Sequence, residues 1–193
     1  GAKTALVTTE GFRDILEIAR GNRPDFFNLQ FAKPEPFVPR HLRREVAGRI
    51  SYRGAEKTPL DLSGLPAILA DFRAEGVEAV AIGLLHSYAN PAHELAVAAE
   101  IRRLWPEVSV VASHQITREW REYERSNTAV ISAYVQPVAA RYLGPLEEGL
   151  ASAAYLGNLY IMQSNAGVHS QLPTNANPIT MVADRLASGF RAA

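Results

Sequence analysis

The sequence predicts an α/β fold with a mostly parallel sheet and helices on both of its faces. Apolar runs of strand length lie at 3–9, 77–85, 108–112 and 159–163, and a short β segment is expected at 45–52. Most of these runs are separated by stretches in which apolar residues recur at helical spacing. Parallel strands need such long crossover connections. Polar side chains follow four of the runs, as expected where parallel strands end in a binding edge.

The first helix follows the first strand, with Thr9 as its cap and Gly21 as its end. Its apolar positions are Phe12, Ile15, Leu16 and Ala19. Residues 22–39 contain four prolines among aromatic residues, so we expect a packed surface loop there. A second helix should run from Ser63 to Gly76, because Leu65, Ile68, Leu69 and Phe72 form a one-sided apolar stripe.

A third helix should begin at Asn90 and Pro91 and end at Pro106, since an amide cap followed by proline is a typical helix start. Its apolar positions are Val97, Ile101 and Leu104. Residues 117–150 are helical in pattern, but Pro137 and Pro145 are expected to kink or divide that segment.

Composition excludes several classes of function. The 193 residues carry 20 Lys plus Arg and 20 Asp plus Glu, so no net field attracts nucleic acid or anionic lipid. The chain has no cysteine, which excludes disulfides, thiolate metal sites and cysteine nucleophiles and is compatible with the cytoplasm. No apolar run is long enough to cross a bilayer. We therefore expect a cytoplasmic protein with no nucleic-acid or membrane partner, and homo-oligomerisation stays open.

Pairs of polar residues at four strand ends are the first candidate site. If the strands are parallel, these residues share one edge of the sheet. The alternative is that each residue only caps a helix or closes a turn. The pairs are Thr8 and Thr9, His86 and Ser87, Ser113 and His114, and Ser164 and Asn165.

The densest polar segment is 118–128, REWREYERSNT, where arginines and glutamates alternate with Trp120 and Tyr123. Charge spacing alone favours i,i+4 pairs on a solvated helix face, with the aromatic residues as packing groups.

Known catalytic motifs are absent. His93 and Glu94 begin like the HExxH motif, but Val97 takes the place of the second histidine, so no zinc site is expected. The sequence also lacks GxxxxGK[ST], GxGxxG and GxSxG motifs.

Several longer blocks resemble the hydantoinase A/5-oxoprolinase family, and they occur in family order from residue 1 to about Val168. LLHSYANPAHE and REYER are the most specific. The blocks are GAKTALVTTEGFRDILEIAR, KPEPFVPRHLRREV, GVEAVAIGLLHSYANPAHE, REYERSNTAVISAYVQPV and MQSNAGV.

The resemblance implies a part of an actin, Hsp70 and sugar-kinase-like (ribonuclease H-like) two-domain architecture that binds ATP between its domains. The family's first phosphate loop, of the DxGGTxTD type, would precede Gly1. Residues 1–116 would form the C-terminal part of the family's N-terminal domain, and residues 117–193 would begin the next domain. We therefore expect an internal piece of a longer parent that is inactive alone.

The implied reaction is ATP-dependent opening of a cyclic amide or imide, such as 5-oxoproline or a hydantoin, through phosphorylation of the amide oxygen. The parent would use ATP and Mg²⁺, whereas the piece would bind neither tightly, and a hydantoinase B-type subunit is the implied partner. Catalytic candidates are Arg121, Glu122, Tyr123, Glu124 and Arg125. Candidates for substrate or phosphate binding are Ser164, Asn165, Gly167, His86 and Ser87.

Two alternatives stay open. One is a subunit piece of an ATP-dependent ketone carboxylase, whose subunits resemble the same family. The other is a module that serves only folding and assembly, which departures from the family pattern favour. Gln115, Ser132 and Ala166 replace the usual glutamate, asparagine and glycine, and the tail reads SGFRAA where an SGPAGG-like turn is usual.

Overall fold

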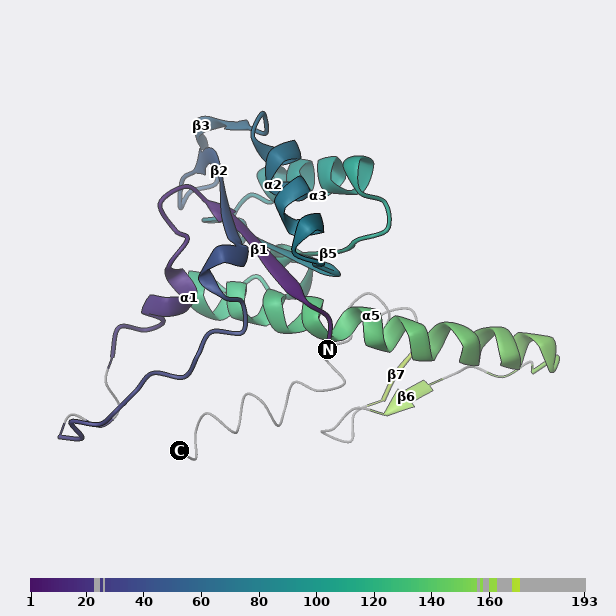
Figure 1. Cartoon of the computed structure of the whole chain (residues 1–193). Coiled ribbons are helices and arrows are strands. Elements are labelled where there is room, and N and C mark those ends of the chain that lie inside the picture. The colour runs from purple at the N-terminus through teal and green to yellow at the C-terminus, as the bar shows by residue number, and fades with distance from the viewer. Residues whose placement is uncertain (23–24, 26, 156, 158–159, 163–167, 171–193) are drawn as a thin grey trace.

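A five-stranded sheet forms the centre of the computed structural model, with strand order β3-β2-β1-β4-β5 (Figure 1). The structure describes residues 1–22, 25, 27–155, 157, 160–162 and 168–170. Strands β1, β2, β4 and β5 are parallel, and β3 is antiparallel to β2. The strands span Thr4–Thr9 (β1), Arg43–Ile50 (β2), Glu56–Asp61 (β3), Ala79–Gly83 (β4) and Ser109–Ala112 (β5).

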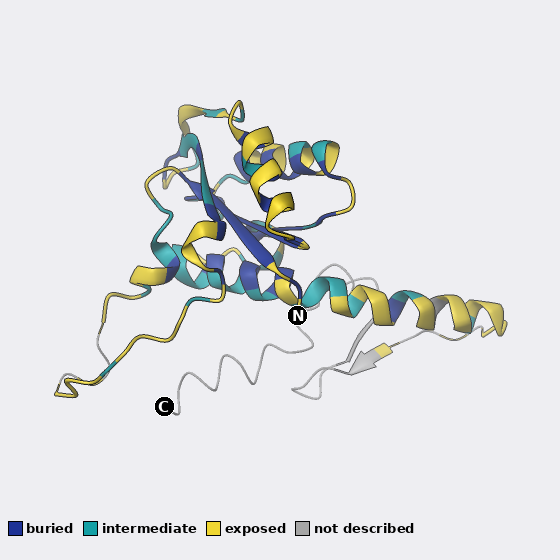
Figure 2. Cartoon of the chain, viewed as in Figure 1, coloured by how far each residue is buried: buried dark blue, intermediate teal, exposed yellow. Residues whose placement is uncertain are grey.

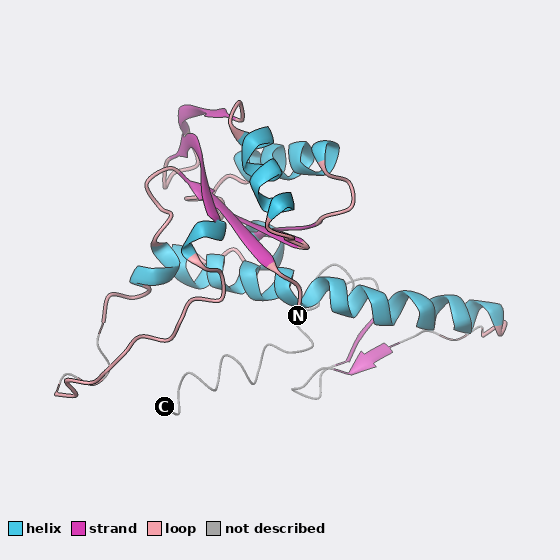
Figure 3. Cartoon of the chain, in the orientation of Figure 1, coloured by secondary structure: helices cyan, strands magenta, loops and turns pink. Residues whose placement is uncertain are grey.

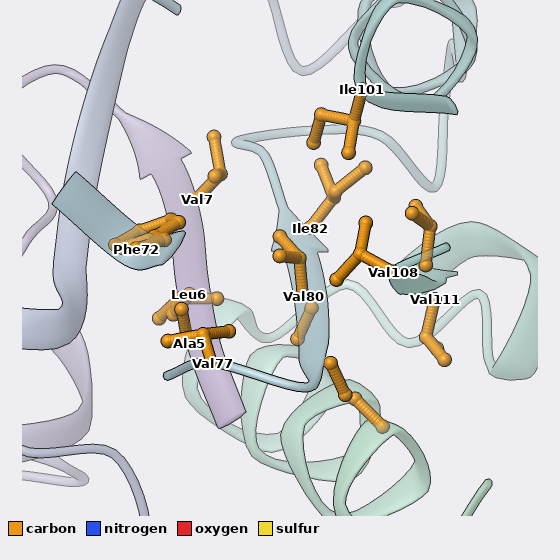
Figure 4. Close-up of a cluster of buried hydrophobic side chains, with 14 of the residues drawn as sticks. Ala5, Leu6, Val7, Phe72, Val77, Val80, Ile82, Ile101, Val108 and Val111 are labelled. Carbon is orange, nitrogen blue, oxygen red and sulfur yellow. The ribbon is translucent and has the colours of Figure 1, made fainter. Parts of the chain in front are cut away.

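Two of the central strands are buried along their whole length. Every residue of β1 and of β4 is buried, as expected for parallel strands covered on both faces (Figure 2). Ile82 of β4 points toward Ile101 of the helix α3, and both side chains are fully buried (Figure 4). The apolar runs of the sequence therefore become the core.

Helices cover both faces of the sheet (Figure 3). Helices α2 (Leu65–Ala74) and α3 (Ala92–Leu104) lie on one face. The short α1 (Ile15–Ile18) and the first half of α5 (Glu122–Ser152) lie on the other. The remaining elements are the 3₁₀ turn η1 (Arg40–Leu42), the single turn α4 (Ser113–Ile116) and a hairpin of β6 (Tyr160–Met162) and β7 (Val168–Ser170).

The predicted fold class is confirmed: a mostly parallel sheet with helices on both faces. The first helix is shorter than expected, since only one turn forms. Strand β3 was not predicted, because five of its six residues are exposed and it contains Pro59. Pro59 is compatible with a strand at the edge of a sheet, where one row of backbone groups needs no partner. An exposed edge strand gives no apolar run to recognise.

Helix α5 is continuous over 31 residues, so the expected division at Pro137 or Pro145 is wrong. Its first half is held by the sheet: Arg125, Ala129, Val130 and Ala133 are all fully buried. Beyond these residues much of the surface is exposed, including Tyr142, which is 67% exposed (Figure 2). Packing of the first half, rather than intrinsic helix propensity, therefore anchors α5.

Gly83, at the end of β4, allows α5 to approach the sheet closely. A Cβ atom built there would lie 2.6 Å from Ser126 Oγ and 3.2 Å from Ser126 Cβ. Because both distances are shorter than ordinary van der Waals contact, any larger residue would push the strand and the helix apart.

We predict that Gly83→Ala destabilises the protein by about 1–3 kcal/mol, because the added methyl group overpacks the contact between strand and helix. Gly144→Ala is the matched control, since a Cβ at Gly144 meets no atom within 4 Å. The free energy of unfolding from urea titration checks both variants. A Gly83→Ala protein as stable as the Gly144→Ala protein would contradict the close packing.

No helix in the described part of the chain is both long and apolar enough to span a membrane.

Candidate functional site

The carboxyl ends of β1 and β4 mark the switch point of the sheet, where the order in which the chain adds strands reverses direction. The chain continues from β1 to β2 on one side, and it returns to β4 on the other side of β1. Open α/β sheets usually bind ligands outside this position. Thr8 Oγ1 donates to the Gly83 carbonyl at 2.9 Å, and the Leu85 N–H donates to Thr9 Oγ1 at 3.0 Å. The predicted meeting of strand ends is therefore confirmed for β1 and β4.

Glu94 of α3 is the centre of a buried polar cluster at this edge. Its side chain is fully buried, and its two carboxylate oxygens accept four hydrogen bonds. Oε1 accepts from the Leu84 N–H at 2.8 Å and from Ser113 Oγ at 2.6 Å. Oε2 accepts from the His114 N–H at 3.0 Å and from His114 Nδ1 at 2.6 Å. One carboxylate thus joins α3 to the ends of β4 and β5.

Arg125 of α5 completes the cluster from the opposite face of the sheet. Its guanidinium donates to the Leu84 carbonyl at 2.8 Å, to the Glu119 carbonyl at 2.7 Å and to Ser113 Oγ at 3.2 Å. It also lies 5.6 Å from the centre of the Tyr88 ring, a cation-π distance. Because each of its three nitrogens has an acceptor, the buried Arg125 side chain holds α5 against the ends of the strands.

Ser113 connects the two charged groups. Its hydroxyl proton goes to Glu94, so its oxygen is free to accept from Arg125 and from the buried Ser87 Oγ, which lies 3.2 Å away. The predicted pairs after β4 and β5 therefore meet through Ser87 and Ser113. The blocks LLHSYANPAHE and REYER, far apart in the sequence, are joined by this hydroxyl and by the direct bond from Arg125 to the Leu84 carbonyl.

The hydrogen bonds keep Glu94 ionised. Burial alone would raise the pKa of its carboxyl group, but the bonds from His114, Ser113 and two backbone N–H groups outweigh burial, so the pKa lies below its usual value. Burial lowers the pKa of Arg125, and the negative charge of Glu94 opposes that shift. Arginine stays protonated at any physiological pH, so the cluster holds one positive and one negative charge.

The loop after β4 is attached to the turn between β2 and β3. His86 Nδ1 donates to the Ile50 carbonyl at 2.7 Å, and Asn90 Nδ2 donates to the Gly54 carbonyl at 2.8 Å. His86 has a positive φ of 58°, a strained conformation for a residue with a Cβ atom. Such strain clusters at functional sites and persists only where surrounding contacts enforce it.

The five residues of REYER occupy different environments. Arg125 is buried in the cluster, and Tyr123 packs partly buried against the core. Glu124 pairs with Arg20 at 2.6 Å and lies 4.0 Å from Arg121. Arg121 is exposed and stacks on the exposed Trp120 at 5.0 Å, and Glu122 is partly exposed. The segment therefore has an inward side, where Arg125 holds α5 against the strand ends, and an outward side, where Arg121 and Glu122 are accessible to another molecule.

Three predicted binding residues, Ser164, Asn165 and Gly167, lie outside the described residues.

A hollow of about 400 Å³ lies between β2 and α2, but no predicted site residue lines it. Its lining includes Arg13, Arg44, Glu45, Asp61 and Ser63. Across the described ranges, no three His, Asp or Glu side chains are grouped as metal ligands would be.

Sequence reasoning missed Glu94 and His114 as a pair. Glu94 was considered only as part of an incomplete zinc motif, and His114 only as a strand end. The available signal was a glutamate among apolar positions of an amphipathic helix, since a carboxylate on a buried helix face needs partners. Its partners are 19 and 20 residues away, which no local pattern shows.

We predict that Glu94→Gln destabilises the fold by about 3–5 kcal/mol, because it leaves the buried Arg125 charge uncompensated. In addition, the NH₂ group of the glutamine side chain would face hydrogen-bond donors that now bond to the carboxylate. Glu100→Gln on the same helix is the control, since Glu100 pairs with Arg103 at the surface and its loss should leave the unfolding midpoint nearly unchanged. Urea titration of both variants measures the difference. Equal midpoints would show that the Glu94 cluster contributes little.

The lowered pKa of Glu94 also predicts how the free energy of unfolding changes at low pH. The carboxylate stabilises the fold fully above its pKa in the unfolded chain, about 4.5. This stabilisation is lost as pH falls toward the lower pKa of the folded state. Below about pH 4.5 we expect the wild type to lose stability more steeply with acid than Glu94→Gln does. Unfolding free energies measured from pH 7 to pH 3 check this, and parallel curves for the two proteins would contradict it.

Residues 1–105 match the family model described as hydantoinase/oxoprolinase N-terminal region. An uncharacterized protein of Methanocaldococcus jannaschii is 37% identical over 97% of this chain and 28% of its own length. Caprolactamase subunit alpha of Pseudomonas jessenii is 36% identical over 87% of this chain and 24% of its own length. The acetophenone carboxylase gamma subunit of Aromatoleum aromaticum is 32% identical over 86% of this chain and 25% of its own length. The chain spans about a quarter of the length of these relatives.

Solved structures agree with this kinship. The crystal structure of the ATP-dependent caprolactamase from Pseudomonas jessenii has a TM-score of 0.78 over 87% of this chain and 25% of its own. The nucleotide-free acetone carboxylase structure has a TM-score of 0.79 over 99% of this chain and 30% of its own; at 24% identity it supports the fold alone. The family model covers more than half of the chain, and so this protein belongs to the hydantoinase/oxoprolinase family.

Proposed function

We propose that the chain is part of a longer ATP-dependent enzyme that opens a cyclic amide, and that its sheet edge forms one wall of that enzyme's site. The family and the caprolactamase relative support the reaction class, since that relative is an ATP-dependent caprolactamase. The observation that carries the location is the contact of the two most specific blocks beside the switch point of the sheet, through Ser113 and the Leu84 carbonyl.

The chemistry explains why such an enzyme uses ATP. An unstrained amide is a poor electrophile, and phosphorylation of its oxygen makes its carbon open to water. Positive groups and Mg²⁺ stabilise the charge on a transferring phosphoryl group. In REYER, Arg125 is buried with an acceptor at each of its three nitrogens, whereas Arg121 and Glu122 have exposed area. We propose that other parts of the parent hold ATP and Mg²⁺.

Within this wall, the outward side of REYER and the loop at His86 are the proposed contact surfaces. Arg121 and Glu122 are the charged members with exposed area, and Tyr123 and Glu124 position the helix start that carries them. Ser87 acts through Ser113 rather than at the surface, because it is buried. Ser164, Asn165 and Gly167 stay proposed on the family pattern.

Two other functions remain in view. A ketone carboxylase is supported by the acetophenone carboxylase relative at 32% identity. A module for folding and assembly is supported by the wholly internal role of Arg125 and Glu94. The names of the relatives, as alpha and gamma subunits, support assembly with a second large subunit, which we propose to be of the hydantoinase B type.

We predict negligible binding of Mg·ATP to the 193-residue chain and measurable binding to the full-length parent in calorimetric titration. With the second subunit present, 5-oxoproline, a hydantoin or a larger lactam should stimulate phosphate release and yield a ring-opened product. Phosphate release that needs bicarbonate and a ketone would instead identify a carboxylase. Binding of Mg·ATP to the chain alone would contradict the proposal that the nucleotide site lies elsewhere.

A further inference from the structure

The ring of His114 is held in one orientation by a buried carboxylate. Its Nδ1 lies 2.6 Å from Glu94 Oε2, and its backbone N–H bonds to the same oxygen at 3.0 Å. The Glu94 side chain has no exposed area, and that of His114 is 8% exposed. Two bonds from one residue to one oxygen fix both the backbone and the imidazole of His114.

The charge state of Glu94 determines which ring nitrogen carries the proton. The pKa of Glu94 is lowered, so its carboxylate is ionised and can only accept hydrogen bonds. His114 Nδ1 must therefore carry a hydrogen. In the neutral imidazole the free electron pair is then on Nε2, which is the basic atom.

Nε2 is not fully buried. It has no hydrogen-bond partner among the described residues, and it is not among the buried side-chain atoms that lack one, which are Arg43 Nη1 and Ser132 Oγ. His114 directly follows Ser113, at the carboxyl edge of β5 next to the switch point. A basic nitrogen with a fixed direction thus lies where an open α/β sheet binds its ligand.

We propose that His114 is a catalytic base of the parent enzyme and that Glu94 is its positioning residue, an inference that rests on the function proposed above. In the step concerned, water adds to the carbon of the activated cyclic amide. One O–H bond of the water breaks, its proton moves to Nε2, and the new C–O bond forms as the C–N π electron pair moves onto the ring nitrogen. The carboxylate of Glu94 stabilises the imidazolium that results.

The surrounding charges suit such a base. Glu94 faces the ring from α3, and Arg125 of α5 contacts Ser113 beside it, with Glu122 as the nearest further acid acting on Arg125. Hydrogen bonds from Ser113, His114 and the Leu84 N–H keep Glu94 ionised. The ring of His114 therefore lies against a carboxylate, and the guanidinium of Arg125 contacts the neighbouring Ser113.

The first test uses the chain itself. Long-range ¹H–¹⁵N correlation spectra of ¹⁵N-histidine protein above pH 8 should show the His114 ring protonated on Nδ1 and bare on Nε2. A ring protonated on Nε2 would overturn the inference, because that tautomer has no free base at the surface. This test does not depend on the activity of the parent.

The second test uses the parent with its second subunit and compares His114→Asn, His114→Ala and wild type. The Asn amide keeps a donor for Glu94 but has no basic nitrogen, so kcat should fall by about 10²–10⁴-fold while KM for ATP and the unfolding midpoint change little. The basic group's limb of the kcat against pH profile should disappear. Added imidazole should restore part of the activity of His114→Ala, which loss of a structural contact alone would not allow.

The outcomes separate the two proposals. A wild-type parent that opens cyclic amides, together with a His114→Asn variant within twofold of it, would overturn the role of His114 and leave the proposed function standing. A wild-type parent that opens no cyclic amide would overturn the proposed function and the catalytic role with it. The spectra of the chain would then still show whether Glu94 fixes the tautomer.

Discussion

The burial of an ionised Glu94 is the constraint on which the sheet edge depends. A carboxylate removed from water is costly unless several donors replace its hydration shell. Four donors from residues 84, 113 and 114 do so here, and they are in place only when the ends of β4 and β5 are side by side. The same hydroxyl of Ser113 then accepts from Arg125, so α5 is drawn to the other face. Secondary structure from both faces of the sheet is therefore assembled around one charge.

This arrangement changes how the family's sequence blocks are understood. In LLHSYANPAHE, His86 and Asn90 bond to backbone carbonyls of the β2–β3 turn, and Glu94 bonds to strand ends. In REYER, Arg125 bonds to the same strand ends. Much of each block is thus explained by the geometry of the edge rather than by contact with a substrate.

The sheet was predictable from the sequence, and the cluster was not. Strands β1 and β4 are unbroken apolar runs, and α2 has a one-sided apolar stripe, so local patterns were enough to place them. Strand β3 is exposed and contains a proline, and it exists because β2 offers it backbone partners. Glu94 and Ser113 are 19 residues apart, and their contact follows from strand order, which a local pattern does not determine. The prediction gave too much weight to Pro137 and Pro145 as helix breakers. Packing of the first half of α5 against the sheet offsets the two backbone hydrogen bonds that these prolines cannot make.

The two halves of α5 differ in what keeps them helical. The first half is buried against β4, whereas the second contains Gly144, Pro145 and Gly149, among the poorest helix formers, and an exposed face with Val138 and Tyr142. Opening of the outer turns exposes little that was not already in water, so it costs less free energy than opening of the core. Amide exchange in the outer turns therefore reports local opening, whereas exchange in β1 or β4 reports the free energy of unfolding of the whole fold.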